Sequence, residues 1–145
     1  MSDFRFQDEF EDDKLNVYLA GPLSDYETPQ QTHTAIIQAA SEYLPEINFI
    51  DPMKLEPEYA SGWEMIRKDL TCVEDADAVF AYRPAGCESW GTQAEIRHAQ
   101  KVNTPVVIYN MDGSDFNHWM HLPFTVEEEL ETCFDALGAL ARIYG

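Results

Sequence analysis

The chain alternates between short, mainly apolar runs and longer segments in which apolar residues recur every three or four positions. Four of the short runs have the length and composition of buried strands. Because these runs are apolar at successive positions, both faces of each strand should be covered, as in a parallel sheet. The four predicted strands span residues 16–20, 47–50, 78–82 and 105–109.

The segments with the longer period predict helices. Thr28-Pro29 has the form of an N-cap followed by a first-turn proline, and apolar residues then continue at helical spacing to Tyr43. In the next such segment, four apolar residues fall on one helix face, which predicts that they join the core. These four are Trp63, Ile66, Leu70 and Val73.

Two more helices are predicted in the second half of the chain. Thr92 is a residue type that caps helices and is expected to open a helix over 92–101. The sequence Thr125-Val126-Glu127-Glu128 has the pattern of a capping box, which predicts that the last helix begins there.

Alternating strands and helices indicate the α/β class. We expect a single-domain parallel sheet with helices on both faces, a Rossmann-like or flavodoxin-like three-layer sandwich. This domain should span residues 14–145. Residues 1–13 are polar and acidic, and we expect a leader that is mobile or lies on a neighbouring subunit.

In an open α/β sheet, ligands bind at the edge formed by the carboxyl ends of the strands. The loops expected at this edge are 21–28, 51–62, 83–91 and 110–124. The chain has neither a Gly-x-Gly-x-x-Gly sequence after the first strand nor a P-loop, so neither of these nucleotide-binding motifs is present. The residues that could meet at the edge include Tyr18, Gly21, Asp51, Arg83, Ser89 and Glu95.

Glu95 lies in the first turn of the helix predicted at 92–101. The positive end of a helix stabilises an ionised carboxylate by about 0.3–1 kcal/mol, which favours an anionic nucleophile. Ordinary helix capping by an acidic side chain is the alternative interpretation of the same position.

The charge balance narrows the range of partners. The chain has 27 acidic and 9 basic residues and a net charge of −18. Nucleic-acid binding is not expected, because contacts with phosphates need Lys and Arg. The acidity has two interpretations: a surface that binds a partner, or an acid-rich surface suited to a high-salt cytoplasm. We prefer the second, because the acidic residues are dispersed along the chain.

The three cysteines are odd in number and form no CxxC pair, which indicates a reducing, cytoplasmic setting. The first residues lack the basic and apolar regions of a signal peptide, and no stretch approaches the roughly 20 apolar residues of a membrane span. His118 and His121 alone are too few for a zinc site, so we expect no metal and no cofactor.

Three motifs follow one another through most of the domain. The first is Val17-Tyr18-Leu19-Ala20-Gly21-Pro22, the second is Asp69-Leu70 eight residues before Asp77, and the third is Gly91-Thr92-x-x-Glu95-Ile96 with Ala99. In this order they resemble the motifs of the nucleoside 2-deoxyribosyltransferase-like superfamily. This group contains nucleoside deoxyribosyltransferases and nucleotide N-glycosidases, and the resemblance covers about residues 16–109.

The resemblance implies roles for the matching residues. Glu95 matches the nucleophile that attacks the anomeric carbon and holds the sugar covalently. Asp69 matches an acid that assists at the base or positions the sugar. Tyr18 matches a tyrosine that borders the site, and Gly91 matches a glycine that lets the chain pass close to the sugar. Gly21, at the end of the first motif, is expected to border the substrate.

The resemblance also implies a homodimer or higher homo-oligomer with shared active sites. In such dimers the loop before the last helix reaches the neighbour's site. Here that loop carries Asn117, His118 and Met120. Trp90 lies in the loop of the third motif, where it could contact the base or the sugar or could pack against the protein.

The chain departs from the transferases at Ser89, six residues before Glu95. Transferases typically have an aspartate there that contacts the 5′-hydroxyl, whereas nucleotide N-glycosidases have a serine in a 5′-phosphate pocket. A hydroxyl can donate to a phosphate, and a carboxylate would repel it. Ser89 thus favours a 5′-monophosphate, with Arg83 as a second contact. Glu88 counts against this interpretation; a turn serine and a surface-paired arginine are the alternative.

We therefore expect an enzyme that cleaves or exchanges the N-glycosidic bond of a 2′-deoxynucleoside or its 5′-monophosphate through a covalent glycosyl-Glu95 intermediate. Transfer and hydrolysis are both open, as are the preferred base and the choice between ribose and deoxyribose. One alternative is a member of the same superfamily that binds or senses a nucleotide without turnover. A structural domain with coincident motifs is another.

Overall fold

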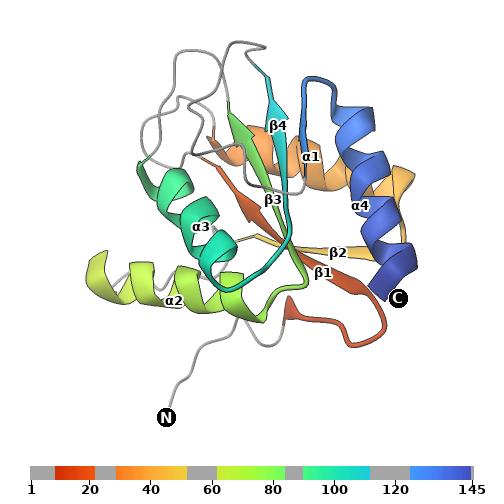
Figure 1. The fold of residues 1–145 in the computed structure, drawn as a ribbon. Coiled ribbons are helices and arrows are strands. Elements are labelled where there is room, and N and C mark those ends of the chain that lie inside the picture. The colour runs from red at the N-terminus through yellow and green to blue at the C-terminus, as the bar shows by residue number, and fades with distance from the viewer. Residues whose placement is uncertain (1–8, 22–28, 52–61, 84–89, 112–124, 145) are drawn as a thin grey trace.

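The computed structural model describes residues 9–21, 29–51, 62–83, 90–111 and 125–144 (Figure 1). The strands are β1 (Leu15–Ala20), β2 (Ile47–Ile50), β3 (Ala78–Arg83), β4 (Val106–Asn110) and β5 (Thr125–Glu127). The helices are α1 (Pro29–Tyr43), α2 (Gly62–Asp75), α3 (Trp90–Lys101) and α4 (Leu130–Tyr144). The four strands predicted from the apolar runs are confirmed, each to within one residue at both ends.

All strand pairs in the sheet are parallel, and the strand order is β2-β1-β3-β4-β5. This is the order of the flavodoxin-like doubly wound fold. Strand β1 pairs on both sides, so that Tyr18 lies opposite Ile50 of β2 and Val79 of β3. The predicted α/β class with a parallel sheet is confirmed.

The sheet separates two apolar cores, because successive side chains of a strand point to opposite faces. On one face, Leu19 and Phe80 belong to a core shared with α1 and α4. On the other face, Tyr18 and Ala81 belong to a core shared with α2 and α3. Figure 1 shows the same three layers, with α1 and α4 on one side of the sheet and α2 and α3 on the other.

The end of the chain differs from the prediction. Thr125–Glu127 forms strand β5 instead of the first turn of a helix, and α4 begins at Leu130. Thr125 and Val126 are in register with Val107 and Ile108 of β4. The capping-box prediction was wrong because the open edge of β4 offers hydrogen-bond partners to the backbone of Thr125–Glu127. These backbone groups therefore do not need the hydrogen bonds of a helix.

The apolar face of α2, which was predicted to join the core, is buried only in the second half of the helix. Val73 is fully buried, but Trp63 and Ile66 are 66% and 60% exposed. The prediction that Trp63 joins the core was therefore wrong. Figure 1 shows the start of α2 away from the sheet, so the apolar stripe continues past the surface that could cover it. The Trp63 ring instead lies 5.0 Å from the Arg67 guanidinium, a cation–π distance.

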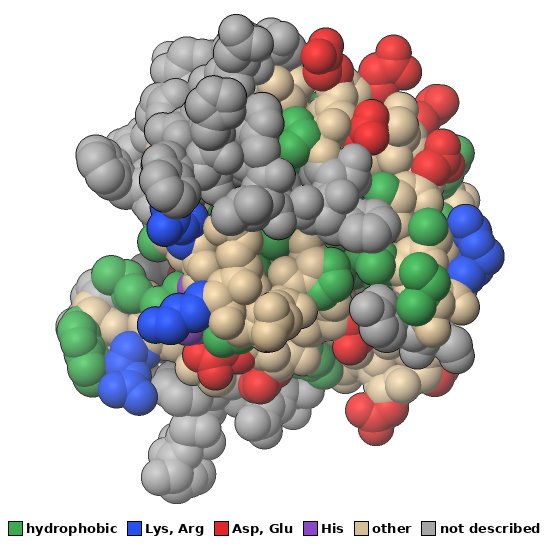
Figure 2. All heavy atoms as spheres, viewed as in Figure 1, with side chains coloured by type: hydrophobic (Ala, Val, Ile, Leu, Met, Phe, Trp, Pro, Cys, Tyr) green, Lys and Arg blue, Asp and Glu red, His purple; other side chains and the backbone are tan. Residues whose placement is uncertain are grey.

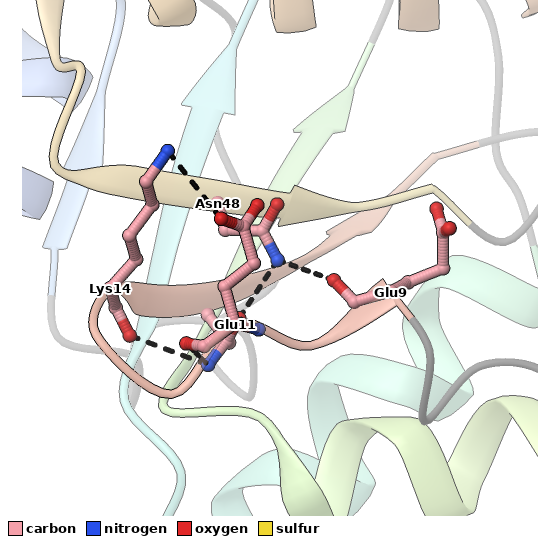
Figure 3. A network of polar contacts seen from close by, with 5 residues as sticks. Glu9, Glu11, Lys14 and Asn48 are labelled. Atoms are coloured by element: carbon pink, nitrogen blue, oxygen red, sulfur yellow. Dashed lines mark hydrogen bonds and ion pairs between the residues drawn. The ribbon is translucent and has the colours of Figure 1, made fainter.

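A polar network ties residues 9–16 to the amino-terminal edge of the sheet (Figure 3). The Asn16 side chain exchanges two hydrogen bonds of 2.9 Å with the Glu11 backbone, and the Asn48 side chain donates to Asn16 Oδ1 at 2.8 Å and to the Glu9 carbonyl. The Asn16 backbone N–H donates to Asp77 Oδ2 at 2.8 Å, so Asp77 has a structural role at the start of β3. Residues 1–8 of the predicted leader lie outside the described residues.

Among the described helices, none has both the length and the apolar character that crossing a bilayer requires.

Candidate active site

The strand order makes the carboxyl ends of β1 and β3 the expected place for a ligand. In a doubly wound sheet with this order, the chain turns to opposite sides after these two strands, and ligands bind where the connections diverge. Here β2 lies on one side of β1, while β3, β4 and β5 lie on the other. Tyr18 and Gly21 come from the end of β1, and Arg83 ends β3.

Tyr18 and Glu95 form the central contact at this edge. The Tyr18 hydroxyl donates a hydrogen bond of 2.6 Å to Glu95 Oε2. Tyr18 is completely buried, whereas Glu95 is partly exposed. A short hydrogen bond from a buried phenol fixes one carboxylate oxygen, and the exposure leaves Glu95 accessible from solvent.

Burial raises the pKa of Tyr18 well above its usual value of 10.0, and the negative charges of Glu95 and Asp69 raise it further. The hydrogen bond to Glu95 acts in the same direction, because a charged phenolate could not donate it. Tyr18 is therefore a neutral hydrogen-bond donor at physiological pH. The charges of two carboxylates, one from α2 and one from α3, thus act on this single hydroxyl.

Asp69 has a cation beside it. Lys68 Nζ lies 3.7 Å from Asp69 Oδ1, and the Lys68 side chain is 2% exposed. Buried lysine is rare in proteins unless it is paired, because the ammonium ion loses its hydration. This pair was not predicted: adjacent Lys and Asp are common on helix surfaces, and nothing in the sequence distinguishes a buried pair.

Cys72 lies one turn from Asp69 on the same helix and is buried. Burial, followed by the charge of Asp69, raises the pKa of the Cys72 thiol to about 12. Since the thiolate is the reactive form, Cys72 is unsuited to act as a nucleophile near neutral pH.

Position 21 has no room for a side chain, which explains the glycine there. A Cβ atom at this position would overlap the ring of Tyr82, which comes from β3. The Tyr82 ring in turn packs edge-on against His33, with ring centroids 5.3 Å apart. His33 Nδ1 lies 3.2 Å from Asp51 Oδ1, and both side chains are buried. These side chains support the Gly21 backbone from the α1 side of the sheet.

His33 and Tyr82 were not predicted as part of this edge. His33 lies in the second turn of α1 between polar neighbours, so that its burial depends on the tertiary packing of α1 against the sheet. Asp51 was predicted at the edge, and the structure places it there, directly after β2 and hydrogen-bonded to His33.

Comparison with known proteins gives matches in structure only. No protein-family profile matches the chain, and no curated protein does. A 2-deoxyribosyltransferase from Bacillus psychrosaccharolyticus superposes with a TM-score of 0.68 at 20% identity, over 83% of this chain and 90% of that protein. A 2-deoxyribosyltransferase from Leishmania mexicana gives 0.67 at 15% identity, over 90% and 99%. A CMP N-glycosidase from Clostridium botulinum gives 0.57 at 15% identity, over 86% and 98%.

This chain has the same fold as these two deoxyribosyltransferases and this CMP N-glycosidase. The resemblance drawn from the three sequence motifs is thereby confirmed at the level of the fold. The three residues that the sequence motifs single out come from β1, α2 and α3: Tyr18 is hydrogen-bonded to Glu95, and the charge of Asp69 acts on the same Tyr18 hydroxyl.

The start of α3 differs from the prediction. The helix begins at Trp90 rather than at Thr92, so Thr92 is not its N-cap and Glu95 is the sixth residue. The field of a helix end falls off within the first turn. The predicted stabilisation of Glu95 by the helix N-terminus is therefore weaker than expected, and a hydrogen bond from the Tyr18 hydroxyl favours the charged form of Glu95.

The remaining predicted substrate contacts are only partly described. The backbones of Arg83, Trp90 and Gly91 lie at the end of β3 and the start of α3, at the expected edge of the superfamily fold. Ser89, His118 and Met120 lie outside the described residues. Among the residues that are described, no three His, Cys, Asp or Glu side chains are grouped as metal ligands would be.

Proposed function

We propose that this protein is an N-glycosyl transferase or hydrolase that acts on a nucleoside or its 5′-monophosphate, with Glu95 as the nucleophile. The observation that carries the proposal is the 2.6 Å hydrogen bond from Tyr18 to Glu95 at the carboxyl edge of the sheet. Support comes from the charge of Asp69 acting on the same hydroxyl and from the superfamily fold.

The chemistry follows from the two carboxylates. Breaking an N-glycosidic bond develops positive charge on the sugar, and a nearby carboxylate stabilises that charge and can form a glycosyl ester. Tyr18 orients the Glu95 carboxylate through Oε2, and an oxygen of this carboxylate attacks the anomeric carbon. Water would then release the free sugar, whereas a second base would give transfer. Both outcomes are compatible with the site.

A member that binds a nucleotide without turnover is the alternative function. It would need a pocket but not a positioned carboxylate. The short hydrogen bond between buried Tyr18 and partly exposed Glu95 favours catalysis, because it orients a group that binding alone does not require.

A screen for released base separates these functions. The protein is incubated with ribo- and deoxynucleosides and their 5′-monophosphates, with and without a second free base, and the products are separated by chromatography. Release of base without an acceptor indicates hydrolysis, and a new nucleoside formed only with an acceptor indicates transfer. Tight binding of a nucleotide with no product would favour the sensing alternative.

We also propose that a 5′-phosphate is bound by Ser89, by backbone amides near Gly91 and by Arg83. A hydrogen bond to a charged group contributes about 1.5–3 kcal/mol. Ser89→Asp should therefore lower kcat/KM for the monophosphate by roughly ten- to hundredfold, with a much smaller effect on the nucleoside. The measurement is kcat/KM for a deoxynucleoside and its monophosphate in both proteins. A wild-type preference for the unphosphorylated nucleoside would contradict the phosphate pocket.

The assembly is a further part of the proposal. We expect a homodimer or a higher homo-oligomer in which the loop with His118 and Met120 completes a neighbour's site. The exposed Trp63 and Ile66 side chains offer apolar surface for such contacts. Light scattering of the purified protein gives the mass in solution and tests this expectation.

A further inference from the structure

Lys68 is a buried cation whose surroundings differ from those of an ordinary surface lysine. Its side chain is 2% exposed, and its ammonium nitrogen has no hydrogen-bond acceptor among the described residues. Its charge partner is Asp69, with Nζ and Oδ1 3.7 Å apart. Burial without a hydrogen-bonded partner is costly for a lysine, so its presence here calls for a compensating role.

The groups that share this part of the site are mostly acidic. Asp69 and Glu95 both act electrostatically on the Tyr18 phenol from α2 and α3, and both also act on the Cys72 thiol. Two carboxylates that share a site disfavour each other's ionisation, and one of them then tends to keep its proton. A neighbouring cation reverses this tendency. Lys68 is the cation beside Asp69, and its charge also opposes the effect of Asp69 on Cys72.

We infer that Lys68 is a positioning residue that keeps Asp69 ionised beside Tyr18 and Glu95, so that Asp69 accepts a hydrogen bond from the sugar instead of donating a proton to the departing base. The inference rests on the proposed function, and it decides between the two roles that the superfamily resemblance leaves open for Asp69. With Lys68 in place, the carboxyl groups of Glu95 and Asp69 are both ionised.

The proton balance of the first step follows. A Glu95 oxygen forms a bond to the anomeric carbon while the bond from that carbon to the base nitrogen breaks. The electron pair of the broken bond stays on the base. Because Asp69 carries no proton, the proton that the base takes up comes from water. The Asp69 carboxylate, with the Lys68 charge beside it, then serves the sugar hydroxyls and not the leaving group.

The charge on Asp69 can be measured without turnover. Carbon-13 NMR of the side-chain carboxyls, with Asp69→Asn to assign the signal, gives its titration midpoint in the wild-type protein. We expect a midpoint below about pH 5, near or under the ordinary aspartate value of about 3.9. A midpoint of about pH 5 or higher would overturn the inference. This titration needs no active enzyme, so its failure is distinct from a failure to detect released base.

Variants of Lys68 test whether its charge is what keeps the titration midpoint of Asp69 low. Lys68→Met should raise the Asp69 midpoint by about one unit or more, and Lys68→Arg should leave it low, because a paired cation lowers an aspartate pKa by about 1–3 units. Lys101→Met removes an equal charge from the exposed last turn of α3 and should not move it. If Lys68→Met does not fold, the wild-type and Lys68→Arg midpoints still decide.

The pH profile of kcat/KM adds a catalytic readout. The acid limb for Lys68→Met should move upward by about the same one unit or more, so that activity is lost at low pH and returns to within about tenfold of wild type near pH 8. A purely structural lysine would lower activity at every pH without moving the limb. An unmoved limb, or an Asp69 midpoint that Lys68→Met leaves unchanged, would overturn the assignment.

Discussion

Tyr18 and Glu95 lie 77 positions apart in the chain, and their hydrogen bond depends on the placement of both β1 and α3. The sequence motifs identified each residue separately, together with Asp69. The motifs could not show that the Tyr18 hydroxyl is the group that joins them, since this depends on the depth of Tyr18 in the core and on the height of Glu95 along α3. The catalytic roles themselves stay predictions.

Removal of the Tyr18 hydroxyl tests its role as the partner of Glu95. Tyr18→Phe keeps the ring that fills the core and removes a hydrogen bond to a charged group, which contributes about 1.5–3 kcal/mol. We expect kcat for base release to fall by roughly ten- to hundredfold. The melting temperature should change little, because the ring packing remains.

Tyr109→Phe is the matched control for this change. Tyr109 comes from β4 and packs against the core on the α1–α4 face, opposite to Tyr18. Its loss of a hydroxyl should leave kcat near the wild-type value. Equal kcat values for Tyr18→Phe and Tyr109→Phe would show that the Tyr18 hydroxyl does not support Glu95.

At the level of elements, the sequence was sufficient for strands β1 to β4 and for the existence of the four helices that the structure describes. Apolar runs and apolar residues at helical spacing indicate which positions are buried, and each of these elements buries at least one face. The errors came where local patterns and tertiary contacts disagree. Thr125–Glu127 has a helix-start pattern but pairs with β4, and Trp90 begins α3 although Thr92 is the better capping residue.

Helix α2 offers a direct test of the apolar stripe that is buried in only one half. Val73→Ala removes buried methyl groups and should destabilise the protein by about 1.5–3 kcal/mol. Trp63→Ala, although a much larger truncation, should cost no more than about 1 kcal/mol, because Trp63 is 66% exposed and contributes mainly its cation–π contact with Arg67.

The free energy of unfolding in urea, measured for both variants and the wild type, checks this order. Both substitutions lie on the same face of the same helix, so each serves as the control for the other. A greater loss for Trp63→Ala than for Val73→Ala would mean that the first half of α2 is covered by another part of the protein or by a neighbouring subunit.

At the scale of the whole molecule, charge is unevenly spread over a strongly acidic surface. Figure 2 shows Asp and Glu side chains gathered near the start of α4, where Glu128, Glu129 and Glu131 are exposed. Lys and Arg side chains are visible over α2 and α3, whose exposed residues include Arg67 and Arg97. The composition predicted the net charge of −18 but could not predict this separation, which depends on how the helices are placed.

The net charge predicts that salt stabilises the protein. The Debye length falls from about 10 Å at 0.1 M salt to about 3 Å at 1 M, so repulsion among dispersed carboxylates is screened. We expect the melting temperature to rise between these two concentrations of KCl. A flat or falling melting temperature would count against adaptation to high salt and would favour an acidic surface that binds a partner.

The central claim, that Glu95 is the group that attacks the sugar, is tested most directly by the rate of base release from Glu95→Gln. Glutamine keeps the size of the side chain and can still pair with the Tyr18 hydroxyl, but it cannot form the glycosyl ester. Glu128→Gln, an exposed glutamate between β5 and α4, is the control. Circular dichroism and the melting temperature establish that both variants are folded.

The account predicts that folded Glu95→Gln releases base at a rate lower than wild type by about a thousandfold or more, while Glu128→Gln is unchanged. Near-normal base release by folded Glu95→Gln would contradict it.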